Sequence, residues 1–235
     1  CIRDRYILEQ AGLGDLTIEL TSDSVRLAKE ALQISEPSRE VLIAGALSSW
    51  PPGDDASNLP THEEIEAAYT EQAELLATSG VDILLLEMVD HFGYTRAALT
   101  AAAGTGLPVW LGLGCEFNSD EGLVTLHDTQ QAVQGELLSL AEIGFSLVSV
   151  MHTQPEDVGP ALAAVRDSWQ GPMGAYAHSG GWAMPNWLWE DIISPEAYLE
   201  YARKWVASGT QVIGGCCGLG PDHIRLLREK LPRQI

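Results

Sequence analysis

The chain has 235 residues, of which 46% are hydrophobic, so it is long enough and apolar enough to bury a sizeable core. Its 33 acidic residues against 13 basic ones give a formal net charge of −20. This charge argues against nucleic acid as a partner, because phosphate binding needs clustered Lys and Arg. The sequence has no apolar run long enough to cross a bilayer and opens without a signal segment, so we expect no membrane partner.

Short apolar runs alternate with longer amphipathic segments along the chain. The runs that we expect to form strands are 40–44, 81–86, 108–112, 147–151, 174–177 and 211–213. The segments that we expect to form helices are 23–33, 61–79, 92–103, 128–142, 156–168, 195–208 and 221–230. Alternation of helices with continuously apolar strands is typical of an α/β protein with a parallel sheet covered on both faces. We therefore predict one domain over residues 1–235 with about six βα units, and a loop, conceivably a lid, over 51–57.

Cysteine usage favours a reducing, cytoplasmic location. The chain has four cysteines, and a fold of this length built on disulfides would normally carry more. Two of the four, Cys216 and Cys217, are neighbours and are therefore poor disulfide partners for each other.

The stretch Gly214–Gly218, with sequence Gly-Gly-Cys-Cys-Gly, directly follows the last expected strand. Thiolates are preferred ligands for zinc, and the glycines permit the bend that would let adjacent cysteines bind one ion. The alternative is that Cys216 and Cys217 are small buried residues beside a turn. The glycine setting favours the metal site.

Side chains that can bind metal or substrate follow several of the expected strands. They are Glu87, Cys115, His152, His178, Cys216 and Cys217. In a parallel barrel the carboxyl ends of all strands open onto one mouth, so residues far apart in sequence can converge there. Two thiolates and one imidazole, with the fourth position open, form a known type of catalytic zinc site.

From near residue 5 to its C-terminus the chain resembles the zinc-dependent homocysteine S-methyltransferases, a family of (β/α)8 TIM barrels. The segments that carry the resemblance occur in the family's order and are 5–12, 28–31, 43–47, 80–87, 214–218 and 221–224. The resemblance implies transfer of a methyl group from a cationic or folate donor to the thiol of homocysteine, or to a related thiol or selenol. It implies Zn²⁺ as cofactor and a place in methionine biosynthesis.

The resemblance also implies roles for residues at the zinc site. Cys216 and Cys217 would bind the zinc ion, and Glu87 would hold the amino group of homocysteine. The family's third cysteine lies in an Asn-Cys-Thr segment, where this chain has Met-His-Thr, so His152 could replace that thiolate. The alternative for His152 is a core or surface histidine. Cys115 is a substitute third ligand, although packing is the favoured role for it.

Two further residues are expected to contact the substrates. His178 stands where the family has an asparagine in a Tyr-Pro-Asn segment, and a satisfied polar residue near the rim is its alternative role. Trp182 belongs to a tryptophan-rich loop over 180–190. Aromatic faces attract cationic methyl donors, while loop packing or an oligomer contact is the alternative.

The first two strands of the family have no counterpart here, so we expect a barrel that is incomplete at the N-terminus. The chain could be a fragment, a homo-oligomer in which another copy closes the barrel, or an altered relative. The last reading leads to an alternative function, that of a catalytically silent homologue serving as a binding or assembly subunit.

Overall fold

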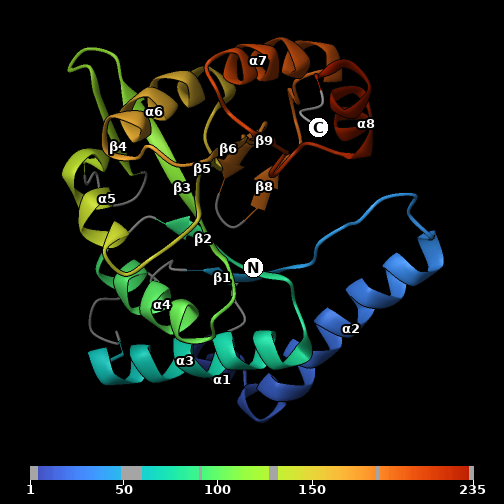
Figure 1. Cartoon of the computed structure of the whole chain (residues 1–235), viewed down its shortest axis with the longest axis vertical. Coiled ribbons are helices and arrows are strands. Elements are labelled where there is room, and N and C mark those ends of the chain that lie inside the picture. The colour runs from blue at the N-terminus through green and yellow to red at the C-terminus, as the bar shows by residue number, and fades with distance from the viewer. Residues whose placement is uncertain (1–4, 49–59, 90–91, 127–131, 184–185, 233–235) are drawn as a thin grey trace. The chain divides into compact units, whose positions relative to one another are not determined.

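The computed structural model describes residues 5–48, 60–89, 92–126, 132–183 and 186–232 (Figure 1). Internal contacts divide the chain into two compact units. The first comprises Cys1–Leu111 and Leu140–Ser146, and the second comprises Gly112–Ser139 and Leu147–Ile235. The expected loop over 51–57 lies outside the described residues.

The first unit alternates helices with parallel strands. Its elements are α1 (Arg5–Gln10), the 3-10 helix η1 (Gly14–Leu16), α2 (Thr17–Ser35), β1 (Ala44–Ser48), α3 (His62–Ser79), β2 (Ile83–Val89), α4 (Phe92–Gly104) and the start of β3 (Val109–Asn118). β1 pairs in parallel with β2, from Ala44 opposite Ile83 to Ser48 opposite Glu87. Helices α2 and α3 pack on each other, as do α3 and α4.

Local signals in the sequence define where α3 begins and ends. The Thr61 hydroxyl accepts a hydrogen bond from the backbone of Glu64, whose carboxylate accepts one from the backbone of Thr61. This reciprocal capping box lowers the pKa of Glu64, chiefly because the Thr61 backbone N–H stabilises its ionised form. The helix ends at Gly80, which adopts the left-handed conformation with φ of 84°.

The second unit holds the rest of the parallel strands. Its elements are the end of β3, β4 (Leu123–Leu126), most of α5 (Val133–Ala141), β5 (Leu147–Met151), α6 (Pro155–Ser168), β6 (Met173–Tyr176), β7 (Gly181–Ala183), β8 (Asn186–Leu188), α7 (Pro195–Ala207), β9 (Val212–Ile213) and α8 (Pro221–Lys230). The strand order is β3-β5-β6-β9, with β4 antiparallel to β3. β6 pairs in parallel with both β5 and β9, while β7 and β8 form a separate antiparallel ribbon.

In both units the parallel strands follow one another in chain order with helices between them, which is the connectivity of a (β/α)8 barrel. The predicted α/β class is therefore confirmed. None of the helices in the described part of the chain combines the length and apolar composition that crossing a bilayer requires.

Several expected strand bounds were wrong. The first strand begins at Ala44 instead of residue 40, and Val41 and Leu42, which precede it, are 39% and 51% exposed. β2 and β3 continue beyond 86 and 112, so Glu87 and Cys115 lie inside strands and do not follow them. β3 is longer than expected because its second half pairs with β4. Neither this pairing nor the β7–β8 ribbon is marked in the sequence by an apolar run from which it could be predicted.

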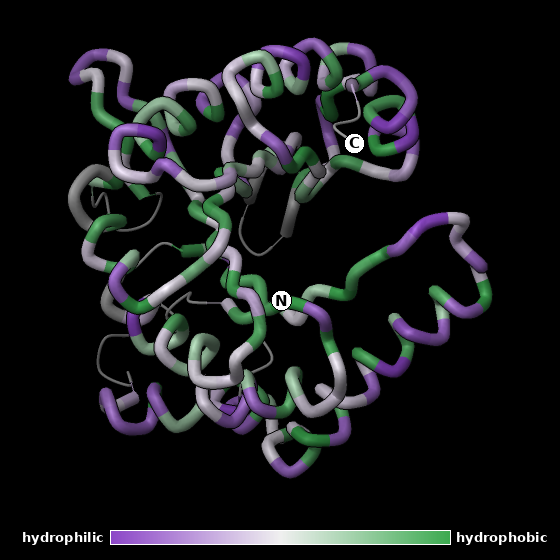
Figure 2. The backbone as a smooth tube through the Cα atoms, viewed as in Figure 1, coloured by the Kyte–Doolittle hydropathy of each residue, from purple (hydrophilic) through white to green (hydrophobic). Residues whose placement is uncertain are grey.

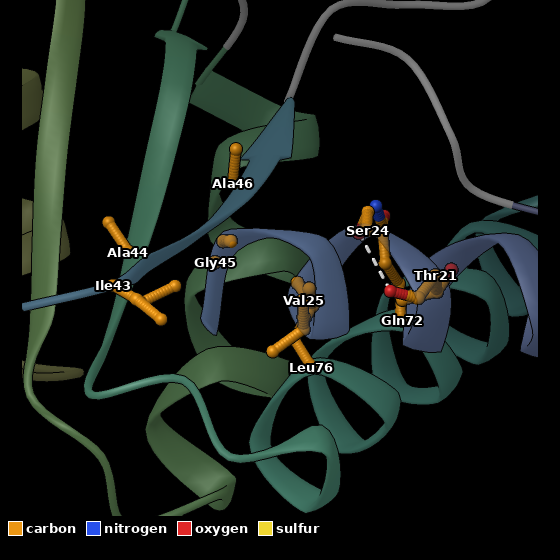
Figure 3. A pocket seen from close by; sticks show the side chains of 10 residues that line it. Thr21, Ser24, Val25, Ile43, Ala44, Gly45, Ala46, Gln72 and Leu76 are labelled. Atoms are coloured by element: carbon orange, nitrogen blue, oxygen red, sulfur yellow. Dashed lines mark hydrogen bonds between the residues drawn. The ribbon is translucent and has the colours of Figure 1, made fainter. Parts of the chain in front are cut away.

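A pocket of about 260 Å³ lies in the first unit, where α2, β1 and α3 meet (Figure 3). Its wall includes Ala44 and Ala46 of β1, which among the described strands pairs only with β2. Thr21 of α2 also lines it, and its buried hydroxyl has no hydrogen-bond partner within the described residues. The hydropathy of α2 alternates along its length (Figure 2), and several of its apolar side chains are exposed, namely Ile18, Leu20, Leu27 and Ile34.

Candidate metal centre

Three side chains from the ends of two strands of the second unit converge on one point. The ligand atoms of His152, Cys216 and Cys217 all lie within 4.8 Å of one another. The Cys216 Sγ lies 3.7 Å from the Nδ1 of His152 and 3.9 Å from the Sγ of Cys217. All three side chains are half-buried, so the group is neither sealed in the core nor fully open to water.

The spacing of these atoms fits a tetrahedral zinc ion. With Zn–S bonds of about 2.3 Å and a Zn–N bond of about 2.0 Å, two sulfurs lie about 3.8 Å apart and a sulfur and a nitrogen about 3.5 Å apart. The distances of 3.9 Å and 3.7 Å are close to these values. A donor set of two thiolates and one imidazole is also the chemistry that zinc prefers. The residues present therefore suit the metal.

His152 is placed by an unusual backbone conformation at the end of β5. Its φ is 45°, in the left-handed region that residues other than glycine seldom adopt. Its backbone N–H donates to the carbonyl of Tyr176 at 3.3 Å, which continues the ladder between β5 and β6 by one residue. The turn from β5 into the loop therefore occurs at His152 itself.

The two cysteines are held by hydrogen bonds to the segment that follows β6. The backbone N–H of Cys216 donates to the carbonyl of Ala177 at 2.8 Å, and that of Ser179 donates to the carbonyl of Cys217 at 2.9 Å. Gly218 then adopts a φ of 80°, and a Cβ at this position would lie 2.2 Å from the carbonyl oxygen of Ser179. Glycine is therefore required directly after the cysteine pair.

The Cys217 thiol ionises readily in this setting. Its pKa is lowered to about 4, first because the Cys216 thiol donates a hydrogen bond to it, and then because of its hydrogen bond and electrostatic interaction with His152. Partial burial acts in the opposite direction and does not offset these interactions. The thiolate form is the form that binds a metal ion.

His178 lies beside the group. Its side chain is 6% exposed, and its ring centroid is 4.5 Å from that of His152, with the ring planes tilted by 59°. Its backbone N–H donates to the carbonyl of Thr153 at 3.1 Å. A second imidazole therefore flanks the histidine of the group.

The other expected site residues are not among the three ligands of this group, within the described part of the chain. Cys115 is fully buried within β3, and the group of ligand atoms within the described residues does not include it. Glu87 is a half-buried residue of β2 in the first unit. Trp182 lies on β7, and its side chain falls outside the part that the structure describes.

Sequence reasoning missed three buried side chains that surround the group. Thr153 directly follows His152, and Ser179 directly follows His178, so their position in the sequence could have indicated that they lie near the site. The Ser179 hydroxyl accepts a hydrogen bond from the backbone of Ile193 at 2.8 Å. Tyr198 lies in the middle of α7, and nothing in its sequence context indicates that it reaches the ends of β6 and β9.

Comparison with known proteins gives one family. The sequence model described as homocysteine S-methyltransferase matches residues 4–231. The chain is 24% identical over 218 residues to homocysteine S-methyltransferase 3 of Zea mays, an alignment that covers 86% of this chain and 63% of that protein. It is 25% identical over 209 residues to selenocysteine Se-methyltransferase of Brassica oleracea var. italica, covering 82% of this chain and 58% of that protein. The chain thus spans about three-fifths of the length of these curated relatives.

Solved structures show the same fold. The metallated form of the homocysteine methyltransferase MmuM from Escherichia coli superposes with a TM-score of 0.74 at 21% identity, over 96% of this chain and 75% of that one. Its oxidized form superposes with a TM-score of 0.76 at 21% identity, over 97% and 76%. At this identity the likeness establishes the TIM-barrel type of fold.

Proposed function

Because the chain belongs to the homocysteine S-methyltransferase family, we propose that it transfers a methyl group to the thiol of homocysteine, or to a related thiol or selenol, and that it does so with a bound Zn²⁺. The observation that carries this proposal is the convergence of His152, Cys216 and Cys217. Relatives named for a thiol acceptor and for a selenol acceptor support the breadth of the acceptor class.

His152, Cys216 and Cys217 would hold the zinc ion and leave its fourth position for the substrate. When bound, zinc lowers the pKa of a coordinated thiol, so that the substrate sulfur is a thiolate at neutral pH. The low pKa of Cys217 means that this ligand needs no further base to release its proton. The half-buried position of all three side chains leaves them accessible to a small thiol.

Three other residues would bind the substrates, as the family resemblance implies. Glu87 would accept hydrogen bonds from the substrate ammonium group, for which a half-buried carboxylate is suited. His178, packed against His152, would contact the substrate beside the metal. Trp182 would offer an aromatic face to a methyl donor that carries positive charge. Orientation of the two substrates would then supply much of the rate.

A second candidate function is that of a catalytically silent binding or assembly subunit, which would act as a homo-oligomer. It is supported by the first unit, where β1 has no second strand partner among the described residues and the Thr21 hydroxyl lies unpaired in a pocket.

The test is a methyl-transfer assay with the full chain, Zn²⁺ and homocysteine. Sulfonium, quaternary ammonium and methylfolate compounds are each supplied as donor, and methionine is measured by mass spectrometry. We expect methionine with at least one donor class and none with the Cys216→Ala variant. Zinc-bound wild-type protein that methylates neither homocysteine nor a related thiol or selenol, such as selenocysteine, with any donor would establish the silent homologue instead.

A further inference from the structure

We propose that two buried hydroxyl groups, those of Thr153 and Tyr198, are positioning groups that set the geometry of His152 and the cysteine pair. The inference rests on the proposed metal centre and adds to it residues that touch neither metal nor substrate. Each hydroxyl donates to a carbonyl within two residues of a ligand, that of Thr153 to Met151 beside His152 and that of Tyr198 to Gly214 before Cys216.

Thr153 acts on the histidine side. Its side chain is fully buried, and its hydroxyl donates to the carbonyl of Met151 at 2.7 Å while accepting from the backbone N–H of Cys115 at 2.9 Å. The bond from Thr153 to Met151 spans His152, because Met151 precedes His152 and Thr153 follows it. The two hydrogen bonds hold a turn in which His152 has a φ of 45°, a conformation that persists only where the surroundings enforce it.

Tyr198 acts on the cysteine side. It is fully buried in α7, and its hydroxyl donates to the carbonyl of Gly214 at 2.8 Å and accepts from the backbone N–H of Ala177 at 3.2 Å. Gly214 lies two residues before Cys216, and the carbonyl of Ala177 accepts the Cys216 N–H at 2.8 Å. One oxygen atom therefore ties the end of β6 to the segment after β9 that carries both thiols.

Burial supports the role of the tyrosine. Loss of solvation raises the pKa of Tyr198, so its hydroxyl stays protonated and remains able to donate to Gly214. Its ring packs edge-on against those of Trp205 and His223, at centroid distances of 5.5 and 6.1 Å, which restricts its position. A donor fixed in this way is suited to hold the peptide before Cys216 in one place.

Buried hydroxyls in this protein do not all make such bonds. Thr210, which precedes β9 in the same unit, is 3% exposed, yet its hydroxyl has no hydrogen-bond partner within the described residues. Thr210 is therefore a matched control for Thr153. Tyr201, one turn along α7 from Tyr198, is half-buried and is the matching control for the tyrosine.

The experiment measures the zinc affinity of the full chain by competition with a chelator. Removing the hydroxyl in Thr153→Val or Tyr198→Phe should weaken zinc binding about 10- to 100-fold, the usual effect of losing a group that orients a ligand. Thr153→Ser, which keeps the hydroxyl, should restore the affinity to that of the wild type. The Thr210→Val and Tyr201→Phe controls should bind zinc as the wild type does.

A cobalt-substituted sample separates positioning from mere structural support. Its visible absorption bands depend on the arrangement of the ligands, so they should shift in Thr153→Val and Tyr198→Phe and remain in place in both controls. If both variants lose only thermal stability, with unchanged zinc affinity and cobalt spectrum, the inference is overturned. If Thr153→Val does not fold, the zinc affinity and cobalt spectrum of Tyr198→Phe alone test the inference. A wild type that binds no zinc contradicts the proposed function itself, before any variant is compared.

Discussion

The surroundings of the cysteine pair and the pocket beside β1 differ in how their buried hydroxyls are bonded. Near the cysteines, the hydroxyls of Thr153 and Tyr198 each make two hydrogen bonds to backbone atoms. In the pocket, the hydroxyl of Thr21 makes none among the described residues. Buried polar groups are normally paired, so an unpaired one that also lines a pocket, as Thr21 does, calls for an explanation.

Side-chain exposure separates the same two regions. Around the metal group, Thr153, Tyr198 and His178 are at most 6% exposed. Along α2, by contrast, Leu27 is 57% and Ile34 is 85% exposed. Within the described residues, the side chains around the proposed metal centre are therefore buried by their neighbours, whereas several apolar side chains of α2 are not.

The largest expected effect is loss of the metal from the first of these regions. We expect Cys216→Ala to reduce bound zinc from about one ion per chain to nearly none, because two remaining ligands hold zinc far more weakly than three. Metal content is measured by mass spectrometry after purification without chelators. The control is Cys115→Ala, which should keep its zinc because Cys115 lies outside the ligand group. Equal zinc in both variants would disprove the assignment.

The acidity of Cys217 gives the second prediction. Its pKa of about 4 lies below the ordinary value of 9.0, so in metal-free protein its thiolate should react with iodoacetamide down to about pH 4. His152→Ala should raise the midpoint of this reaction, since the imidazole stabilises the thiolate. A wild-type midpoint near that of an ordinary thiol would contradict the geometry of the group.

The same pKa affects stability in a defined direction. A group whose pKa is lowered by folding stabilises the native state fully above its unfolded-state pKa, and this contribution declines as the pH falls to the folded-state value. For metal-free protein, the contribution of Cys217 should therefore be lost between about pH 9 and pH 4. Measuring the free energy of unfolding of the wild type and of Cys217→Ala across this pH range isolates the contribution of Cys217.

The glycine after the cysteines gives the third prediction. Gly218→Ala should lower the free energy of unfolding by about 3 kcal/mol, because it adds both a strained positive φ and a clash with the Ser179 carbonyl. Gly122→Ala is the control, since Gly122 has a φ of 63° with no atom near its Cβ position. It should cost only about 1 kcal/mol. Chemical denaturation measures both, and equal losses would show that the clash is relieved at little cost.

The sequence was most informative where local chemistry decides the structure. The glycine-flanked cysteine pair and the Met-His-Thr segment led to three residues that the structure brings within 4.8 Å of one another. The start of α7 is another local feature, because Ser194 precedes Pro195 in the sequence and its hydroxyl accepts a hydrogen bond from the backbone of Ala197. In each of these cases the residues that form the feature lie within a few positions of one another in the sequence or at the ends of strands.

Features that depend on distant partners could not be predicted. Cys115 lies inside β3 because that strand is extended by pairing with β4, and this pairing has no local signal. Tyr198 reaches Gly214 and Ala177 only through the packing of α7. Val41 and Leu42 are apolar enough to suggest a strand, but they are exposed, and pairing with β2 begins only at Ala44.

The smallest expected effect tests the pocket. Thr21→Val removes a buried hydroxyl that has no partner within the described residues, so the free energy of unfolding should stay the same or rise by up to about 1 kcal/mol. Thr17→Val on the same helix is the control, because the Thr17 hydroxyl donates to the carbonyl of Gly14 at 2.7 Å. It should lower the free energy of unfolding by about 1 kcal/mol. If Thr21→Val proves as harmful as Thr17→Val, the pocket is not a gap in the packing.

X-ray absorption at the zinc edge of the purified wild-type protein is the decisive measurement for the proposed metal centre. We expect a metal bound by two sulfurs at about 2.3 Å and at least one imidazole nitrogen at about 2.0 Å. A first shell without sulfur, or a protein that neither contains nor takes up zinc, would contradict it.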